Sequence, residues 1–334
     1  MTLQFISSLS AVSRETSREL GGALVGEPAN GALPAWPVQR VFAPLLGSTA
    51  SAIHETWLAD APVISGCGEG IVWRRSNNLL YGVLELDEAD FPSSATGSSL
   101  QAASEEAYRR IFRLLDAEQV PHLWRVWNYL AAINLETHGL ERYRQFNIGR
   151  QDAFLEGHRD AAGNVPAACA IGLAGGPLSI AFLASTTPAL PLENPRQVSA
   201  YNYPADYGPR SPTFSRAALA YLPDQEFLFI SGTASIVGHQ TVATGDAVGQ
   251  CRESMANIAA VVGEANRLSR SGPFVLSELA YRVYIRHAAD FEAIRGALSP
   301  LIGMAEVVYV QADICRNDLL LEIEALASHS LKGS

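Results

Sequence analysis

A thiol and two carboxyl groups lie close together near the C-terminus, in the stretch C-R-N-D-L-L-L-E-I-E-A from Cys315 to Ala325. Residues 319–325 predict a β-strand, because they are mostly apolar and follow a polar turn. Side chains alternate along a strand, so Glu322 and Glu324 share one face. Two interpretations are open: a solvated face of a sheet, or a face on which a buried carboxylic acid delivers a proton.

A second cluster of reactive side chains is found in the segment 203–216, Y-P-A-D-Y-G-P-R-S-P-T-F-S-R. Its prolines stiffen the chain, and irregular segments of this kind often present side chains to ligands. Tyr207, Arg210 and Arg216 are the candidates for ligand contacts. The alternative is a connector whose arginines pair with Asp206 or face solvent.

Two further arginines lie in elements with a regular pattern. Arg150 is part of F-N-I-G-R-Q-D-A-F, and Arg282 alternates with Tyr284 and Arg286 on one face of a predicted strand. That face is either exposed or a floor that binds carboxylates. Basic charge comes almost entirely from arginine, whose planar fork suits carboxylate groups.

Several common catalytic and cofactor motifs are missing from the sequence. There is no Walker A motif, no G-x-S-x-G and no H-E-x-x-H, and the four cysteines form no C-x-x-C. The stretch G-C-G-E-G at 66–70 precedes a strand-like segment rather than a helix, so it predicts a turn and no dinucleotide site. These motifs therefore give no indication of a metal site or a dinucleotide site.

The elements that must position these side chains occur in two similar series. The first series comprises a hairpin at 71–86, a helix capped by Ser98 or Ser99, a strand at 122–133, a helix around 139–156 and two strands within 167–185. The second comprises a strand at 226–232, a helix capped by Asp246, a strand at 275–286, a helix at 288–298 and strands at 306–314 and 319–328.

This internal repeat predicts an α+β fold of two modules, each a mixed sheet with helices packed on one face. We expect these domain boundaries: N-terminal strands and loops at 1–60, the first module at 61–186, a connector at 187–216, the second module at 217–329 and a tail at 330–334.

The repeat also bears on the two glutamates. When S-I-A-F-L-A-S at 179–185 is aligned with E-I-E-A-L-A-S at 322–328, Ser179 matches Glu322 and Ala181 matches Glu324. The apolar face is kept and the carboxylates are not, so this strand does not require them. Glu322 therefore becomes a candidate for chemistry.

Composition excludes several classes of partner. The chain has 334 residues and a net charge of −10, which argues against binding to nucleic acids or to anionic membranes. No apolar run reaches the roughly 18 residues of a membrane span. The N-terminus lacks the basic and apolar regions of a signal peptide, so a cytoplasmic protein with reduced cysteines is expected.

The second half resembles the RidA/YjgF family in I-S-G-T-A-S, in the following helix and above all in L-E-I-E-A. A fuller pattern resembles the chorismatase family over most of the chain. It consists of Y-P-A-D-Y-G-P-R-S-P-T-F-S-R-A, then F-I-S-G-T-A-S-I-V-G-H-Q-T, and finally C-R-N-D-L-L-L-E-I-E-A.

The resemblance implies two RidA/YjgF-like halves and an enzyme that removes the enolpyruvyl group of chorismate as pyruvate without a cofactor. It implies that Glu322 is the general acid. Cys315 and Gly232 match the members that form hydroxybenzoates, so this product is expected, with Cys315 assisting. The two carboxylates of chorismate require cations, and the expected substrate-binding residues are Arg150, Tyr207, Arg210, Arg216, Gly232, Thr233 and Arg282.

Alternatives remain for both reaction and assembly. The chain could hydrolyse chorismate to a dihydroxycyclohexadiene carboxylate, act as an imine deaminase on the same glutamate, or bind a ligand without catalysis. The ratio of 3- to 4-hydroxybenzoate is open. Two modules in one chain can bury what single-module relatives bury by association, so a monomer is expected and a homo-oligomer is the alternative.

Overall fold

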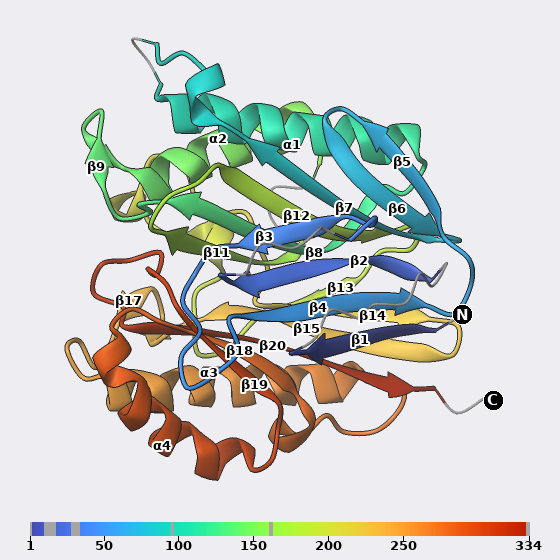
Figure 1. The fold of residues 1–334 in the computed structure, drawn as a ribbon. Coiled ribbons are helices and arrows are strands. Elements are labelled where there is room, and N and C mark those ends of the chain that lie inside the picture. Colours follow the sequence, from blue (N-terminus) through green and yellow to red (C-terminus); the bar gives the residue numbers. More distant parts are fainter. Residues whose placement is uncertain (1, 10–17, 28–33, 95–96, 160–162, 332–334) are drawn as a thin grey trace.

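The computed structural model describes residues 2–9, 18–27, 34–94, 97–159 and 163–331. Two six-stranded sheets lie between two pairs of helices (Figure 1). Helices α1 (Ser99–Ala117) and α2 (Arg142–Glu156) cover the outer face of the first sheet. Helices α3 (Ala247–Leu268) and α4 (Phe291–Ile302) cover the outer face of the second.

The first sheet has the strand order β11-β8-β12-β7-β6-β5. Only the neighbours β8 and β11 run parallel. Its strands are β5 (Ile64–Gly68), β6 (Ile71–Ser76), β7 (Leu79–Leu86), β8 (His122–Ala131), β11 (Ala167–Leu173) and β12 (Leu178–Ser185).

The second sheet has the order β13-β14-β15-β20-β18-β19, and here only β18 and β19 run parallel. Its strands are β13 (Leu190–Leu192), β14 (Ala217–Leu222), β15 (Gln225–Thr233), β18 (Ala280–Ile285), β19 (Val307–Gln311) and β20 (Leu321–Ser330). Two short hairpins complete the modules: β9 (Glu136–Thr137) with β10 (Leu140–Glu141), and β16 (Ile236–Val237) with β17 (Gln240–Thr241).

The two sheets repeat each other strand by strand, with β7, β12, β8 and β11 in the places of β15, β20, β18 and β19. The register repeats as well: Ser179 is paired with Tyr129 as Glu322 is paired with Tyr284. The predicted α+β class and the internal repeat are therefore confirmed, and Ser179 is the structural equivalent of Glu322.

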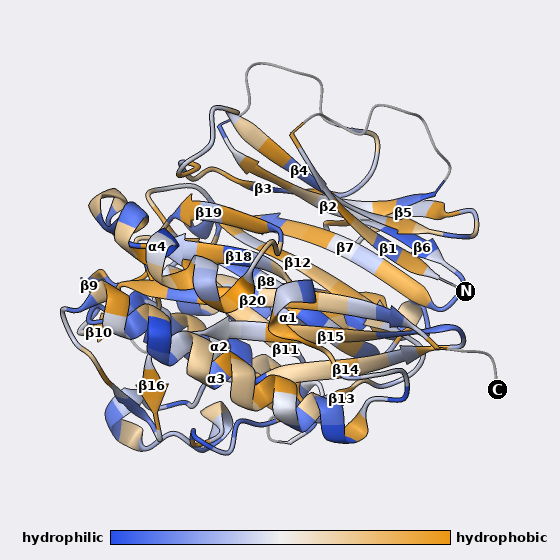
Figure 2. Ribbon diagram, turned by 90° about the horizontal axis from the view of Figure 1, so that it is seen from below, coloured by the Kyte–Doolittle hydropathy of each residue, from blue (hydrophilic) through white to orange (hydrophobic). Residues whose placement is uncertain are grey.

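A four-stranded sheet from the N-terminal part flanks the two larger sheets on one side (Figures 1 and 2). Its strands β1 (Leu3–Ser8), β2 (Glu19–Gly26), β3 (Val38–Val41) and β4 (Ala52–Ala59) have the order β1-β4-β2-β3. The buried Gln39 of β3 donates hydrogen bonds from Nε2 to Ser179 Oγ and to Trp127 O, both at 3.2 Å. In the first module, the side chain of Gln39 from the N-terminal sheet thus packs directly against Ser179, the equivalent of Glu322.

Three apolar cores hold these layers together. One lies between each pair of helices and its sheet, and the third joins all three sheets at the centre of the molecule. At this centre the hydroxyl groups of Tyr129 and Tyr284 lie 2.6 Å apart, one from each module. Both inner sheet faces are therefore buried, which is why side chains on the Glu322 face of β20 do not meet bulk solvent.

The local predictions are mostly confirmed. Ser98 caps α1 by accepting a hydrogen bond from the Gln101 amide at 3.2 Å, and Asp246 caps α3 through Gly249 at 2.9 Å. Several predictions were wrong at their edges: the helix expected at 288–298, for example, is found at Phe291–Ile302. The turn expected at 66–70 is reduced to 69–70, because β5 forms an extra edge strand beside β6, and the strand expected from 275 begins only at Ala280, after a short 3₁₀ turn.

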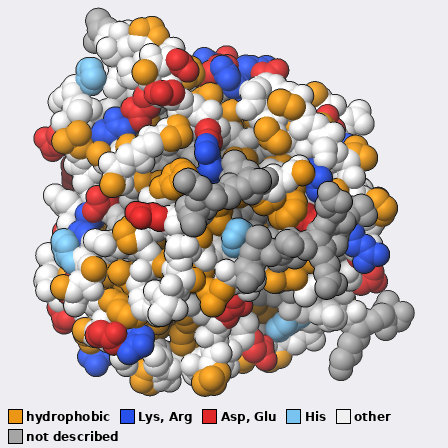
Figure 3. All heavy atoms as spheres, in the orientation of Figure 1, with side chains coloured by type: hydrophobic (Ala, Val, Ile, Leu, Met, Phe, Trp, Pro, Cys, Tyr) orange, Lys and Arg blue, Asp and Glu red, His pale blue; other side chains and the backbone are white. Residues whose placement is uncertain are grey.

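The predicted tail at 330–334 is described only at residues 330 and 331; parts of the predicted N-terminal region, 1, 10–17 and 28–33, also lie outside the described residues. On the face shown in Figure 3, acidic and basic side chains are interspersed. No helix in the described ranges is both long and apolar enough to cross a bilayer.

Candidate active site

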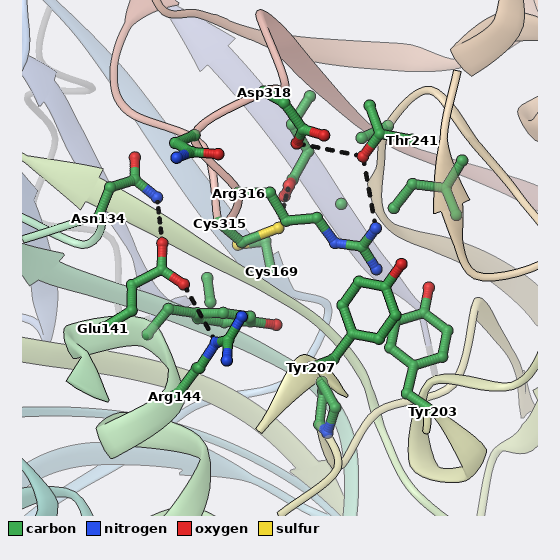
Figure 4. A pocket seen from close by; sticks show the side chains of 18 of the residues that line it. Asn134, Glu141, Arg144, Cys169, Tyr203, Tyr207, Thr241, Cys315, Arg316 and Asp318 are labelled. Atoms are coloured by element: carbon green, nitrogen blue, oxygen red, sulfur yellow. Dashed lines mark hydrogen bonds and ion pairs between the residues drawn. The ribbon is translucent and has the colours of Figure 1, made fainter. Parts of the chain in front are cut away.

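A cavity of about 400 Å³ opens between the two modules, near the ends of β11 and β20 (Figure 4). The first module contributes side chains from α2 and β11, and the second contributes β15, β20 and the turn before β20. The connector closes one side with its aromatic rings. The residues used below that line it are Tyr143, Arg150, Cys169, Tyr203, Tyr207, Arg216, Gly232, Cys315, Arg316 and Glu322.

Glu322 projects from β20 into this cavity with only 4% of its surface exposed. Burial is the main reason that the pKa of its carboxyl is raised to about 8, and the nearby charge of Glu324 raises it further. Arg125, the Cys315 thiol and Arg216 oppose the shift. The group is therefore mostly protonated at neutral pH, as a general acid must be.

Gly232 on β15 makes room for that carboxyl. A Cβ at this position would lie 1.8 Å from Glu322 Oε1 and 3.2 Å from the Cβ of Cys169. The first distance is far inside van der Waals contact, so only glycine is compatible with the observed position of the acid.

Cys315 lies in the turn before β20, and its Sγ donates a weak hydrogen bond to Glu322 Oε2 over 3.8 Å. Burial raises the pKa of this thiol strongly, and the neighbouring Glu322 adds to the shift. The side chain is therefore a neutral thiol that orients one oxygen of the acid, and its thiolate is disfavoured at neutral pH.

Arg150 and Arg216 reach the cavity from opposite sides. Arg150 of α2 is 1% exposed and donates from Nη2 to Asn147 Oδ1 at 2.8 Å. Arg216, just before β14, donates to the Val198 carbonyl at 2.8 Å and to the Tyr203 hydroxyl at 2.7 Å. In each case Nε is buried without a hydrogen-bond partner among the described residues, so both guanidinium groups retain capacity for an anionic ligand.

Arg316 is a third guanidinium at the cavity, and the sequence analysis did not select it. It lies 4.1 Å from the ring centre of Tyr207 (Figure 4), and its Nη1 donates to the His239 carbonyl at 2.9 Å. Its Nη2 is buried without a partner in the described part of the chain. The signal was its position next to Cys315 in the C-R-N-D motif. Tyr143 and Tyr203 also line the cavity, and the sequence analysis did not select them as site residues.

Three of the predicted substrate-binding residues lie elsewhere. Arg210 forms an ion pair with Asp152 Oδ1 at 2.9 Å and does not line the cavity. Thr233 follows Gly232 on β15, so its hydroxyl turns away and donates to the Ser231 carbonyl at 2.7 Å. Arg282 is buried, but its guanidinium is held by the carboxylate of Glu55. None of these three residues lines the cavity.

The remaining predicted residues are brought together. Glu322, Cys315, Gly232, Arg150, Arg216 and Tyr207 all line the same cavity. Within the described ranges, no group of three or more His, Cys, Asp or Glu side chains is arranged to hold a metal ion. A fourth arginine of the lining, Arg144, is paired with Glu141 at 3.6 Å. The arrangement thus offers the buried carboxyl of Glu322 together with three arginines that form no ion pair in the described part of the chain, which suits proton delivery to an anionic organic molecule.

Comparisons with known proteins agree on one family. The family model "Chorismatase FkbO/Hyg5-like, N-terminal" matches residues 55–184. A chorismatase from Streptomyces hygroscopicus is 39% identical over 284 residues, which cover 83% of this chain and 80% of the relative. A 3-hydroxybenzoate synthase from the same species is 35% identical over 297 residues, covering 84% of this chain and 83% of that protein.

A crystal structure of a chorismatase superposes with a TM-score of 0.86 at 33% sequence identity, and the match covers 98% of both chains. The same family is thus found in the sequence and across the whole fold, and the chain belongs to the chorismatase family.

Proposed function

We propose that this protein is an enzyme that converts chorismate to pyruvate and a hydroxybenzoate, with 3-hydroxybenzoate as a product. The observation that carries the proposal is the buried acid form of Glu322 in a cavity lined by arginines with unused donors. The names of the relatives, chorismatase and 3-hydroxybenzoate synthase, support the substrate and the product.

Binding of the substrate follows from its two carboxylates. Each needs a cation or several hydrogen-bond donors, and a guanidinium fork supplies both. Arg150, Arg216 and Arg316 line the cavity, and each has a buried guanidinium nitrogen without a hydrogen-bond partner among the described residues. The ring of Tyr207 beside Arg316 limits the space available to a flat cyclohexadiene ring.

The reaction begins with transfer of the Glu322 proton to the methylene carbon of the enolpyruvyl group. The C3–O bond then breaks, and its electron pair stays on the departing oxygen, which leaves as the ketone of pyruvate. The C4 hydroxyl oxygen forms a new bond to C3 and returns its proton to the Glu322 carboxylate. The C–O bond of the resulting arene oxide opens, the ring carbon loses a proton and the oxygen gains one, so chorismate is divided into pyruvate and hydroxybenzoate without water.

The direct test is incubation of the purified protein with chorismate, with pyruvate measured enzymatically and aromatic products separated by chromatography. We expect pyruvate and hydroxybenzoate in equal amounts. Pyruvate with a dihydroxycyclohexadiene carboxylate would instead place the chain in the hydrolytic branch. If chorismate binds without turnover, the protein is a ligand-binding module, whereas ammonia release from an imine substrate would indicate the deaminase alternative.

Replacing Cys315 with alanine is expected to raise the share of dihydroxycyclohexadiene carboxylate while pyruvate release stays within about tenfold of the wild type. The substitution removes the thiol donor to Glu322 and opens space for a water molecule beside the reacting carbon. The measurement is the product ratio from chorismate. Cys251→Ala is the matched control, because that cysteine is buried under α4 near the Ile294 carbonyl. An unchanged ratio in Cys315→Ala would remove the cysteine from product control.

A further inference from the structure

A second buried group of charged side chains lies next to the cavity and does not line it. Glu324 on β20, Arg125 on β8, Arg282 on β18 and Glu55 on β4 are each at most 7% exposed. We call these four residues the inner charge cluster. It joins all three sheets, and its two arginines balance its two glutamates.

Glu324 is at the centre of this cluster. Arg125 Nη2 forms an ion pair with Glu324 Oε2, and Arg282 Nη1 lies 3.1 Å from Oε1. The Tyr284 hydroxyl donates to Oε1, also at 3.1 Å. Three donors, two of them charged, therefore hold the carboxyl of Glu324 in a fixed position.

The cluster is close to the proposed acid because Glu324 and Glu322 are alternate residues on the same face of one strand. The first module shows that the fold does not need it. There, Ala181 stands in the place of Glu324, and Trp127 in the place of Arg282. Buried ion pairs contribute little net stability, so a specific role is required to explain the cluster.

We propose that Glu324, fixed by Arg125, is a positioning residue whose negative charge keeps Glu322 in its acid form. The inference rests on the proposed role of Glu322. Its physical basis is repulsion, since a second carboxylate next to an ionised one is costly in a medium of low polarity. The titratable and charged side chains that interact most strongly with Glu322 are Glu324, Arg125, Arg216, Cys169, Cys315 and Tyr143.

The carboxyls of Glu136, Glu141 and Asp318 also line the cavity, but Glu324 is the carboxyl with the largest effect on Glu322. Burial is the largest cause of the raised pKa of Glu322, the charge of Glu324 comes next, and Arg125 acts in the opposite direction. Within the ion pair, Glu324 favours the acid form of Glu322 and Arg125 opposes it. Replacing each residue in turn should therefore shift the pKa of Glu322 in opposite directions.

The test compares Glu324→Gln with Arg125→Met in the full-length protein. For the wild type, kcat/KM with chorismate is expected to fall as the pH rises through about 8, where Glu322 loses its proton. Glu324→Gln removes the negative charge that repels ionised Glu322, while Arg125 still attracts it. The fall of kcat/KM at alkaline pH, the alkaline limb of the profile, therefore moves to lower pH by about one unit. Arg125→Met removes the attraction, so the limb moves to higher pH.

Opposite shifts distinguish tuning of Glu322 from damage to the core, which would lower the rate in both variants without moving the limb. Glu55→Gln is the matched control, because it removes the other carboxylate that holds Arg282, and no limb shift is expected. If Glu324→Gln does not fold, Arg125→Met decides alone: a shift to higher pH supports the inference, and an unchanged limb or a shift to lower pH overturns it.

A second readout does not depend on turnover. Infrared difference spectra of the substrate-free protein, assigned by the carboxylic band lost in Glu322→Gln, follow the protonation of Glu322 directly. Movement of this titration in opposite directions in the two variants supports the inference. If the titration is the same in both variants and the wild type, the inference is wrong even where pyruvate release is normal. If Glu322→Gln turns over chorismate normally, the proposed acid is wrong, and the spectra still decide the role of Glu324.

Discussion

Replacing Glu322 with glutamine is expected to lower pyruvate release from chorismate by about 10³-fold. Glutamine has nearly the shape of the protonated acid, so it preserves the packing against Cys315 and Gly232. It has no proton to transfer to the enolpyruvyl methylene carbon. The measurement is kcat with saturating chorismate, together with the dissociation constant for chorismate from calorimetry.

The loss is expected in kcat, while the dissociation constant changes little, because the arginines that hold the carboxylates are unchanged. Glu306→Gln is the matched control, since Glu306 lies outside the cavity, just before β19. If Glu322→Gln released pyruvate at the wild-type rate, another group would have to supply the proton.

The second large effect is expected at Gly232. Its replacement by alanine places a methyl carbon 1.8 Å from Glu322 Oε1, so the carboxyl must move. A displacement of about 1 Å at the reacting group can lower the rate by roughly 10²-fold. We therefore expect kcat with chorismate to fall by about this factor while the protein remains folded.

The control for Gly232→Ala is Gly263→Ala on α3, where an added Cβ meets no atom within 4 Å. This control variant should keep wild-type turnover. Thermal unfolding of both variants separates a local shift of Glu322 from general loss of structure. Wild-type kcat in Gly232→Ala would show that the acid has room to adjust, contrary to the tight fit observed.

Much of the fold could be predicted because it depends on local patterns. Ser98 and Asp246 cap their helices as expected, and alternation correctly placed Glu322 and Glu324 on one face of β20. The alignment of Ser179 with Glu322 is confirmed by the register of the two sheets. These features depend on residues that are close in sequence or repeated in it.

Burial of the Glu322 face could not be predicted in this way. Alternating glutamates look the same on a solvated sheet and on one covered by a second sheet, and the covering strands come from the other module. The ion-pair partners of the arginines could not be predicted either, because they lie far away in the sequence. Glu55, which holds Arg282, is 227 positions away in the sequence. The contact between Arg316 and Tyr207 joins two segments more than 100 residues apart.

The Gln39 side chain at Ser179 means that the two halves of this duplicated fold are subject to different constraints. At the Glu322 end, a substitution must preserve the proposed acid and the open cavity beside it. At the Ser179 end, the amide of Gln39 lies where a pocket would have to open, so a substitution there need only preserve packing and hydrogen bonds. In the first module, β12 thus serves as a scaffold, whereas α2 and β11 still contribute Arg150 and Cys169 to the cavity.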